Sequence, residues 1–157
     1  MKELMEYRTS LIDRIAEASN EFCDLCRANG DPKAHMEGSW TLHQLAAHTR
    51  DIQRLVYGMR ARSTVNEDNP LFDKFDADGW MADQYDSHES LESILNEFMS
   101  DITEEVEWLH SLPNEAWNRK SKHVTMGSGY TLQTWVERGL SHIEEHLRIA
   151  RQAKVHE

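Results

Sequence analysis

Apolar residues recur every three or four positions in four segments of the chain, which is the spacing of one face of an α-helix. The first apolar stripe runs from Leu4 to Leu25. Gly30 follows the stripe and Pro32 lies just beyond it. This order is typical of a helix end, because glycine accepts the left-handed cap conformation and proline cannot continue a helix. We therefore expect the first helix to end at Asn29.

The second helical segment begins after Trp40. Thr41 and Gln44 have the spacing of a capping box, in which each side chain binds a free backbone N–H at the helix start. The pattern after this box predicts a helix whose buried face carries four apolar residues: Leu45, Ile52, Leu55 and Met59.

The third segment is expected to begin near Asp86, where Glu89 gives the spacing of a second capping box, and to end before Pro113. Its apolar stripe runs from Leu91 to Leu109. The fourth segment begins near Thr131 and carries apolar residues along two adjacent lines. This last helix is therefore expected to contact two neighbours.

Four amphipathic helices must bury their apolar faces against one another, and a bundle allows this. The pattern predicts an all-α fold, an antiparallel four-helix bundle that forms one domain over residues 1–157. Two long connections, Ser63–Tyr85 and Pro113–Tyr130, are expected to pack onto the bundle because they carry large aromatic side chains. These are Phe72, Phe75, Trp80, Trp117 and Tyr130.

Charge limits the range of binding partners. The chain has 28 acidic and 17 basic side chains, a formal net charge of −11. It has no evident basic face, so binding along nucleic acid or to an anionic membrane surface is not expected. The N-terminal residues lack the apolar segment of a secretory signal, and no stretch is long and apolar enough to span a bilayer. We expect a cytoplasmic protein.

Two cysteines, Cys23 and Cys26, lie near the C-terminal end of the first predicted helix. A redox-active C-x-x-C pair normally lies at a helix N-terminus, where the helix dipole lowers the thiol pKa. We therefore expect buried, unreactive thiols, and two cysteines do not make a disulfide scaffold.

Histidines occupy positions where the helical pattern predicts core residues. His142 and His146 are four residues apart, hence one turn apart on one face of the fourth helix. His48 interrupts the second stripe between Leu45 and Ile52. For any one of them, a hydrogen bond to water or backbone is the simpler interpretation. Three buried imidazoles together favour a shared divalent metal ion, bound at about 2.0–2.1 Å, which would satisfy all of them.

Other residues could complete such a metal site. Three protein ligands leave one coordination position open, which is the pattern of catalytic zinc. Asp51, three residues after His48, is the candidate catalytic residue, as a proton acceptor or a group that orients a ligand, and a solvated carboxylate fits equally well. His123 could approach the ion, but a surface position is the stronger expectation. The other histidines are expected at exposed positions or helix ends: His35, His43, His88, His110 and His156.

Three segments resemble, in order and spacing, the sequence signatures of the DinB superfamily. They are W-T-L-H-Q-L-A-A-H-T-R-D from Trp40, L-H-S-L-P-N-E-A-W from Leu109, and T-L-Q-T-W-V-E-R-G-L-S-H-I-E-E-H-L-R-I-A-R-Q from Thr131. The resemblance implies a DinB-like four-helix bundle, commonly a homodimer, with a three-histidine site for Zn²⁺ or Ni²⁺. Carried over by position, the metal ligands would be His48, His142 and His146.

Family members of known activity include S-transferases that use bacillithiol or mycothiol and a mycothiol-dependent isomerase. The resemblance therefore implies a low-molecular-weight thiol or another small molecule as a candidate substrate. Three hypotheses follow. The first is a metal-dependent enzyme, such as a thiol-dependent S-transferase or a hydrolase. The second is a non-catalytic metal-binding or stress-response protein. The third is an interaction module whose metal site is degenerate and empty.

Overall fold

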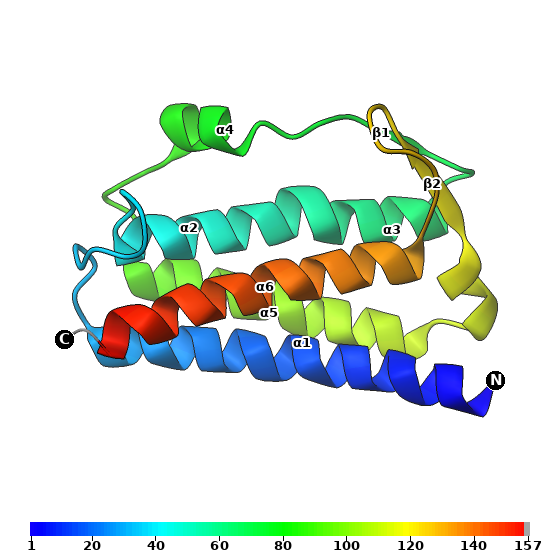
Figure 1. Cartoon of the computed structure of the whole chain (residues 1–157), viewed down its shortest axis with the longest axis horizontal. Helices are drawn as coiled ribbons and strands as arrows, with labels where there is room; N and C mark the ends of the chain where they lie inside the picture. The colour runs from blue at the N-terminus through cyan, green and yellow to red at the C-terminus, as the bar shows by residue number, and fades with distance from the viewer. Residues whose placement is uncertain (156–157) are drawn as a thin grey trace.

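Four long helical segments form a bundle in the computed structural model, which describes residues 1–155 (Figure 1). The predicted all-α four-helix bundle is therefore confirmed. The second segment is continuous but irregular, because α2 passes through a π-helical turn, η1, into α3. The segments are α1 (Lys2–Asn29), α2 (Leu42–Ile52), η1 (Gln53–Tyr57), α3 (Gly58–Asn66), α5 (Leu91–Ser111) and α6 (Leu132–Val155).

The helices do not simply alternate in direction. Arg14 of α1 binds Glu144 of α6 at 2.8 Å. Further along both helices in the same direction, Glu21 binds Arg151 at 2.6 Å. Thus α1 and α6 run parallel to each other, and α2–α3 runs parallel to α5 (Figure 1). The contacts between these two pairs, α1 with α5 and α2–α3 with α6, are antiparallel.

Two connections add structure outside the helices. Residues 67–90 form a crossover that returns from α3 to the start of α5 and includes α4 (Ala77–Gln84) (Figure 1). The connection from α5 to α6 holds a 3₁₀ turn, η2 (Asn114–Asn118), and a β-hairpin. One hairpin strand also pairs in parallel with the crossover, giving a three-stranded sheet that the sequence pattern did not predict. The strands, in sheet order, are β1 (Leu71–Phe72), β2 (Lys120–His123) and β3 (Gly127–Thr131).

Aromatic residues of both connections pack onto the bundle, as expected. Phe72 and Trp117 are buried. Trp135 of α6 receives Phe72 edge-on, with ring centroids 5.7 Å apart, and Tyr130 stacks on the same indole at 5.5 Å. The indole Nε1 of Trp135 donates to Ser121 Oγ at 2.8 Å. These contacts fix the sheet against the first turn of α6.

The start of α5 differs from the prediction, whereas the capping box at the start of α2 is confirmed. The pattern predicts a helix start near Asp86 with Glu89 as the capping partner. In the structure Ser90 is the cap, because its Oγ accepts the N–H of Ser93 at 3.0 Å. Glu89 is used elsewhere: its carboxylate accepts from Arg50 of α2 at 2.6 Å.

The π-helical turn shifts the buried face of the second helix. The N–H of Gly58 binds the carbonyl of Gln53, so the turn holds one residue more than an α-turn. A β-carbon at Gly58 would lie 2.7 Å from that carbonyl oxygen, which explains the glycine. Beyond the turn, Met59 is 42% exposed although regular spacing predicted it in the core. Arg60 and Ala61 are buried instead.

The bundle core is apolar and contains both cysteines. Phe22 of α1 and Phe98 of α5 meet edge-to-face with ring centroids 6.0 Å apart. Cys23 and Cys26 are buried free thiols, and burial raises the pKa of both to about 12, in agreement with the expected unreactive pair. Most charged residues occupy the outer helix faces. No helix in residues 1–155 has the length and apolarity that crossing a bilayer requires.

Candidate metal centre

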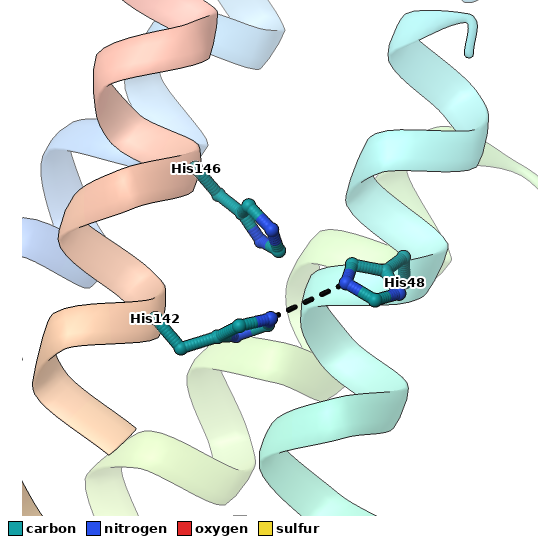
Figure 2. Close-up of side chains that lie close together, drawn as sticks. All are labelled: His48, His142 and His146. Carbon is teal, nitrogen blue, oxygen red and sulfur yellow. Dashed lines mark hydrogen bonds between the residues drawn. The ribbon is translucent and has the colours of Figure 1, made fainter. Parts of the chain in front are cut away.

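Three histidines from two helices face one another. His48 lies on α2, and His142 and His146 lie one turn apart on α6 (Figure 2). Their possible ligand atoms, one from each ring, all lie within 4.8 Å of one another. The Nε2 atoms of His48 and His142 are 3.2 Å apart. Two nitrogens that bind one tetrahedral ion at 2.0–2.1 Å are about 3.3 Å apart, so the observed spacing suits a single divalent ion.

Close contact between η1 and α6 allows the rings to meet. A β-carbon at Gly139 of α6 would lie only 3.2 Å from the Cβ of Tyr57 of η1. A larger residue at this position would therefore push the two helices apart. The ring of Tyr57 also packs against that of His142, with centroids 5.6 Å apart, one turn further along α6. Gly139 thus contributes to the spacing of the histidines.

A threonine fixes the orientation of His146. The Thr49 hydroxyl donates to the carbonyl of Leu45 at 2.7 Å, so its oxygen is free to accept. Nδ1 of His146 lies 2.8 Å from that oxygen and therefore carries the proton. Nε2 of His146 is then left with its lone pair, which is the form that binds a metal ion.

A Thr49→Val variant tests this arrangement. We expect its affinity for zinc to fall by about 10–100-fold, the usual effect of losing a group that orients a metal-bound histidine. Thr64→Val is the matched control, because Thr64 is equally buried and donates to Arg60 in the same way but contacts no histidine. Competition with a fluorescent chelator measures both affinities. Equal affinities in the two variants would contradict the orienting role of Thr49.

The shortest contact in the cluster has an alternative interpretation without metal. Nε2 of His142 and Nε2 of His48 can share one proton in a direct hydrogen bond. That bond leaves the Nε2 lone pair of His146 without a partner. Nδ1 of His142 also has no hydrogen-bond partner among the described residues, although it is buried. A divalent cation would use a lone pair from each of the three rings, so the donor set fits such an ion.

The three imidazoles are neutral in this fold. Burial lowers the pKa of His48 to about 4, against the opposing charges of Asp51 and Asp78. Burial and the neighbouring imidazoles lower the pKa of His142 to about 4 and that of His146 to about 2. At pH 7 the cluster can therefore accept a cation without first losing protons.

A buried carboxyl group lies behind the centre, beside the π turn. Nε2 of Gln53 donates to Oε2 of Glu105 at 2.9 Å. Burial raises the pKa of Glu105 to about 7, with Arg62 opposing the shift and Asp101 adding to it. Oε1 of Gln53 has no partner within residues 1–155. The buried pair of Gln53 and Glu105 therefore keeps one oxygen without a hydrogen bond to any described residue, close to the helix that carries His48.

Glu105→Gln is expected to stabilise the protein at pH 8 by up to roughly 3 kcal/mol. Glutamate ionises in the unfolded chain near pH 4.5 but in the folded protein only near 7, so folding loses stability as pH rises from 4.5 to 7. Glutamine never ionises and keeps an oxygen for Gln53. Urea unfolding at pH 5 and pH 8 measures the difference, which should be small at pH 5. The exposed neighbour Glu104→Gln is the control, and an equal effect there would contradict the assignment.

A cavity of about 400 Å³ borders the cluster. His48 and His142 are among its lining residues, and Trp135, Phe75 and Val56 contribute apolar surface. Its cationic residues are Arg60, Lys74 and Arg138. A larger groove of about 710 Å³ runs along the outer face of α1 but holds no histidine. The smaller cavity is therefore the candidate substrate site, and its size is typical of small-molecule sites.

Asp51 lies beside the cluster but is not among the residues that line the cavity. Its Oδ1 accepts from Nε of Arg50 at 2.9 Å, and its Oδ2 accepts from Nε1 of Trp80 at 3.1 Å. Arg50 also binds Glu89. The carboxylate therefore links α4 to α2, and its charge acts on His48 from nearby.

His123 does not lie at the surface, so that expectation is wrong. It is 6% exposed, because strand pairing of β2 with β1 and β3 draws it inward, and it lines the same cavity as His48. Its Nδ1 accepts the N–H of Thr125 at 3.2 Å. Within residues 1–155 it is not part of the cluster of potential ligands, which comprises only the three histidines.

The remaining histidines divide into two groups. His43, at the start of α2, is buried and contacts the hydroxyl of Tyr85 and the carbonyl of Glu89, so it holds the crossover in place. The exposed positions expected for the others are observed at His35, His88 and His110. His156 lies outside the described residues.

The apolar spacing of the sequence did not identify two residues that lie beside the cavity and the histidine cluster. Thr49 directly follows His48 in a buried stretch of α2. A buried hydroxyl needs a hydrogen-bond partner, and this need could have identified Thr49 from the sequence. Arg60 is buried just after the π turn, and a charged side chain gives no apolar signal by which its burial could have been predicted.

Comparison with known proteins tests the resemblance. A family model described as DinB superfamily matches residues 8–150, which is most of the chain. The chain belongs to the DinB superfamily. This assignment confirms the resemblance found in the sequence. Curated proteins give no significant match to this DinB protein.

A solved structure shares the fold of this DinB protein. It is described as "YfiT from Bacillus subtilis is a probable metal-dependent hydrolase with an unusual four-helix bundle topology". The two structures agree with a TM-score of 0.85 over 96% of this chain and 87% of the other. Their sequences are 16% identical, so the likeness establishes the fold.

Proposed function

We propose that His48, His142 and His146 hold one divalent metal ion, zinc or nickel, and that the protein is a metal-dependent enzyme. One observation carries the proposal: three neutral imidazoles converge beside a cavity large enough for a small substrate. No fourth ligand side chain joins them within residues 1–155. Three protein ligands with an open position are typical of catalytic rather than structural metal sites.

The residues around the cluster would orient the ligands. Thr49 sets the proton position of His146, and Trp40 packs against the ring of His48 with centroids 4.5 Å apart. Asp51 is proposed as a positioning residue rather than a proton acceptor, because both of its oxygens already accept hydrogen bonds. A bound divalent ion supplies a Lewis acid, which lowers the pKa of a water molecule or thiol at the open position.

The proposed reaction is a hydrolysis or the transfer of a low-molecular-weight thiol. The first alternative is supported by the description of YfiT as a probable metal-dependent hydrolase. The second is supported by the family resemblance and by the cationic cavity, which favours a thiolate. We also propose a cytoplasmic homodimer, from the family resemblance. The net charge of −11 supports neither nucleic acid nor an anionic membrane as a partner.

Turnover by metal-loaded protein tests this proposal. Metal-free protein would be reconstituted with zinc or nickel and assayed for ester and amide hydrolysis and for conjugation of small thiols to electrophiles. We expect one class of activity that a chelator removes and that His142→Ala lacks. His110→Ala, an exposed histidine of α5, is the control and should keep the activity. Stoichiometric metal without turnover in either class would favour the non-catalytic metal-binding alternative.

A further inference from the structure

The cavity beside the histidines has a cationic lining. Arg60 of α3, Lys74 of the crossover and Arg138 of α6 border it, and no carboxylate among the described residues does. The chain as a whole has 28 acidic and 17 basic side chains, so this lining is opposite in sign to the protein. Unbalanced positive charge in a cleft raises the local concentration of anions.

The three cations lack ionic partners. Many arginines of this protein are paired, for example Arg54 with Asp101 at 2.8 Å. By contrast, the part of the chain that the structure describes offers no carboxylate within ion-pair distance of Arg60, Lys74 or Arg138. The guanidinium of Arg138 lies over the ring of Tyr130 at 5.4 Å, and the residue is exposed. Its Nη1 donates to Sδ of Met126 at 3.7 Å, a weak acceptor, so its other N–H groups can bind a ligand.

Arg60 is the only one of the three that is buried, at 6% exposure. Its guanidinium lies over the ring of Trp135 at 4.9 Å and near that of Phe72 at 5.8 Å. Nη2 donates to the carbonyl of Asp73 at 2.9 Å, whereas Nε finds no acceptor among the described residues. A buried cationic N–H without an acceptor is costly, and a ligand oxygen would satisfy it.

The charges of all three cations act on His123. Burial lowers the pKa of His123, and the three cations of the cavity lower it further, against the opposing charge of Asp73. Arg138 likewise adds to the effect of burial in lowering the pKa of Arg60. The cations therefore act on common neighbours within the cavity.

We propose that this cavity contains a subsite for the oxyanion group, a carboxylate or a phosphate, of a small-molecule substrate. Arg138 and Arg60 bind the oxyanion, because guanidinium groups present several N–H donors that suit such oxygens. Lys74 adds charge at the exposed side. The inference rests on the proposed function in one respect, which is that the reacting group of the substrate lies at the histidine end. The volume of about 400 Å³ suits a small molecule.

Binding of inorganic phosphate and of succinate to metal-free protein tests the subsite. Amide NMR spectra would be recorded at constant ionic strength, so that screening does not change during the titration. We expect shifts centred on His123 and Arg138, and affinities about tenfold weaker in Arg138→Gln and Lys74→Gln. Both substituted residues are exposed, so these variants should fold. Arg14→Gln, a surface residue paired with Glu144, is the charge-matched control and should bind as the wild type does.

Equal affinities in Arg138→Gln and Arg14→Gln, or no binding to wild-type protein, would overturn the subsite. A His146→Ala variant separates this result from the fate of the metal proposal. We expect its affinity for metal to fall by more than about 100-fold but its affinity for phosphate and succinate to match that of the wild type. If anions bind only after metal is added, and Arg138→Gln has no effect, the ion alone holds them and the subsite is wrong. If metal never binds but anion binding depends on Arg138, the subsite stands and the proposed function fails.

Discussion

Zinc or nickel added to metal-free protein is expected to raise the melting temperature by roughly 8–16 °C when free metal exceeds its dissociation constant about 1,000-fold. The ion binds only the folded chain, because α2 and α6 bring His48 together with His142 and His146 only there. At that excess the stabilisation is about 4 kcal/mol, and in a domain of this size each kcal/mol shifts the transition by about 2–4 °C.

Calorimetry of chelator-treated protein, with and without each metal, measures this shift. Magnesium is the control ion, because it prefers oxygen ligands and should leave the transition unchanged. A melting temperature that zinc and nickel do not alter would contradict the proposed centre and would favour a degenerate, empty site.

The second large effect is expected in His146→Ala, whose affinity for metal should fall by more than about 100-fold. Loss of a group that only orients a ligand costs about 10–100-fold, and removal of a ligand itself should cost more. His146 is the most deeply buried residue of the cluster. Within residues 1–155 no further potential ligand belongs to the cluster, so none is placed to replace it.

Elemental analysis after dialysis, together with chelator competition, measures this loss. His88→Ala is a suitable control, since that residue is exposed and lies in the crossover away from the cluster. A His146→Ala protein that retained one metal ion per chain would remove His146 from the ligand set.

Much of the candidate centre could be predicted from local pattern alone. His142 and His146 are four apart on a long amphipathic helix, so their shared face follows from helical geometry. His48 interrupts an apolar stripe, which marks it as a buried polar residue needing a partner. Helix ends were predictable where the signal was local, as at Gly30, which caps α1 in the left-handed conformation.

What the pattern could not predict depends on contacts between distant segments or on helix irregularity. His123 is buried because β2 pairs with β1, about 50 residues earlier in the chain, and a two-residue strand leaves almost no periodic signal. Met59, which regular spacing places in the core, is exposed, because the π turn before it adds one residue to the turn and shifts the helix face that follows. The engagement of Asp51 by Trp80 likewise requires the crossover to fold over α2.

Anomalous diffraction from crystals of the zinc- or nickel-loaded protein, recorded at the absorption edge of the metal, tests the central claim most directly. The account predicts one strong peak per chain, about 2.0–2.1 Å from a ring nitrogen of each of His48, His142 and His146. A peak bound by other residues, or no peak between α2 and α6 in metal-loaded crystals, would contradict it.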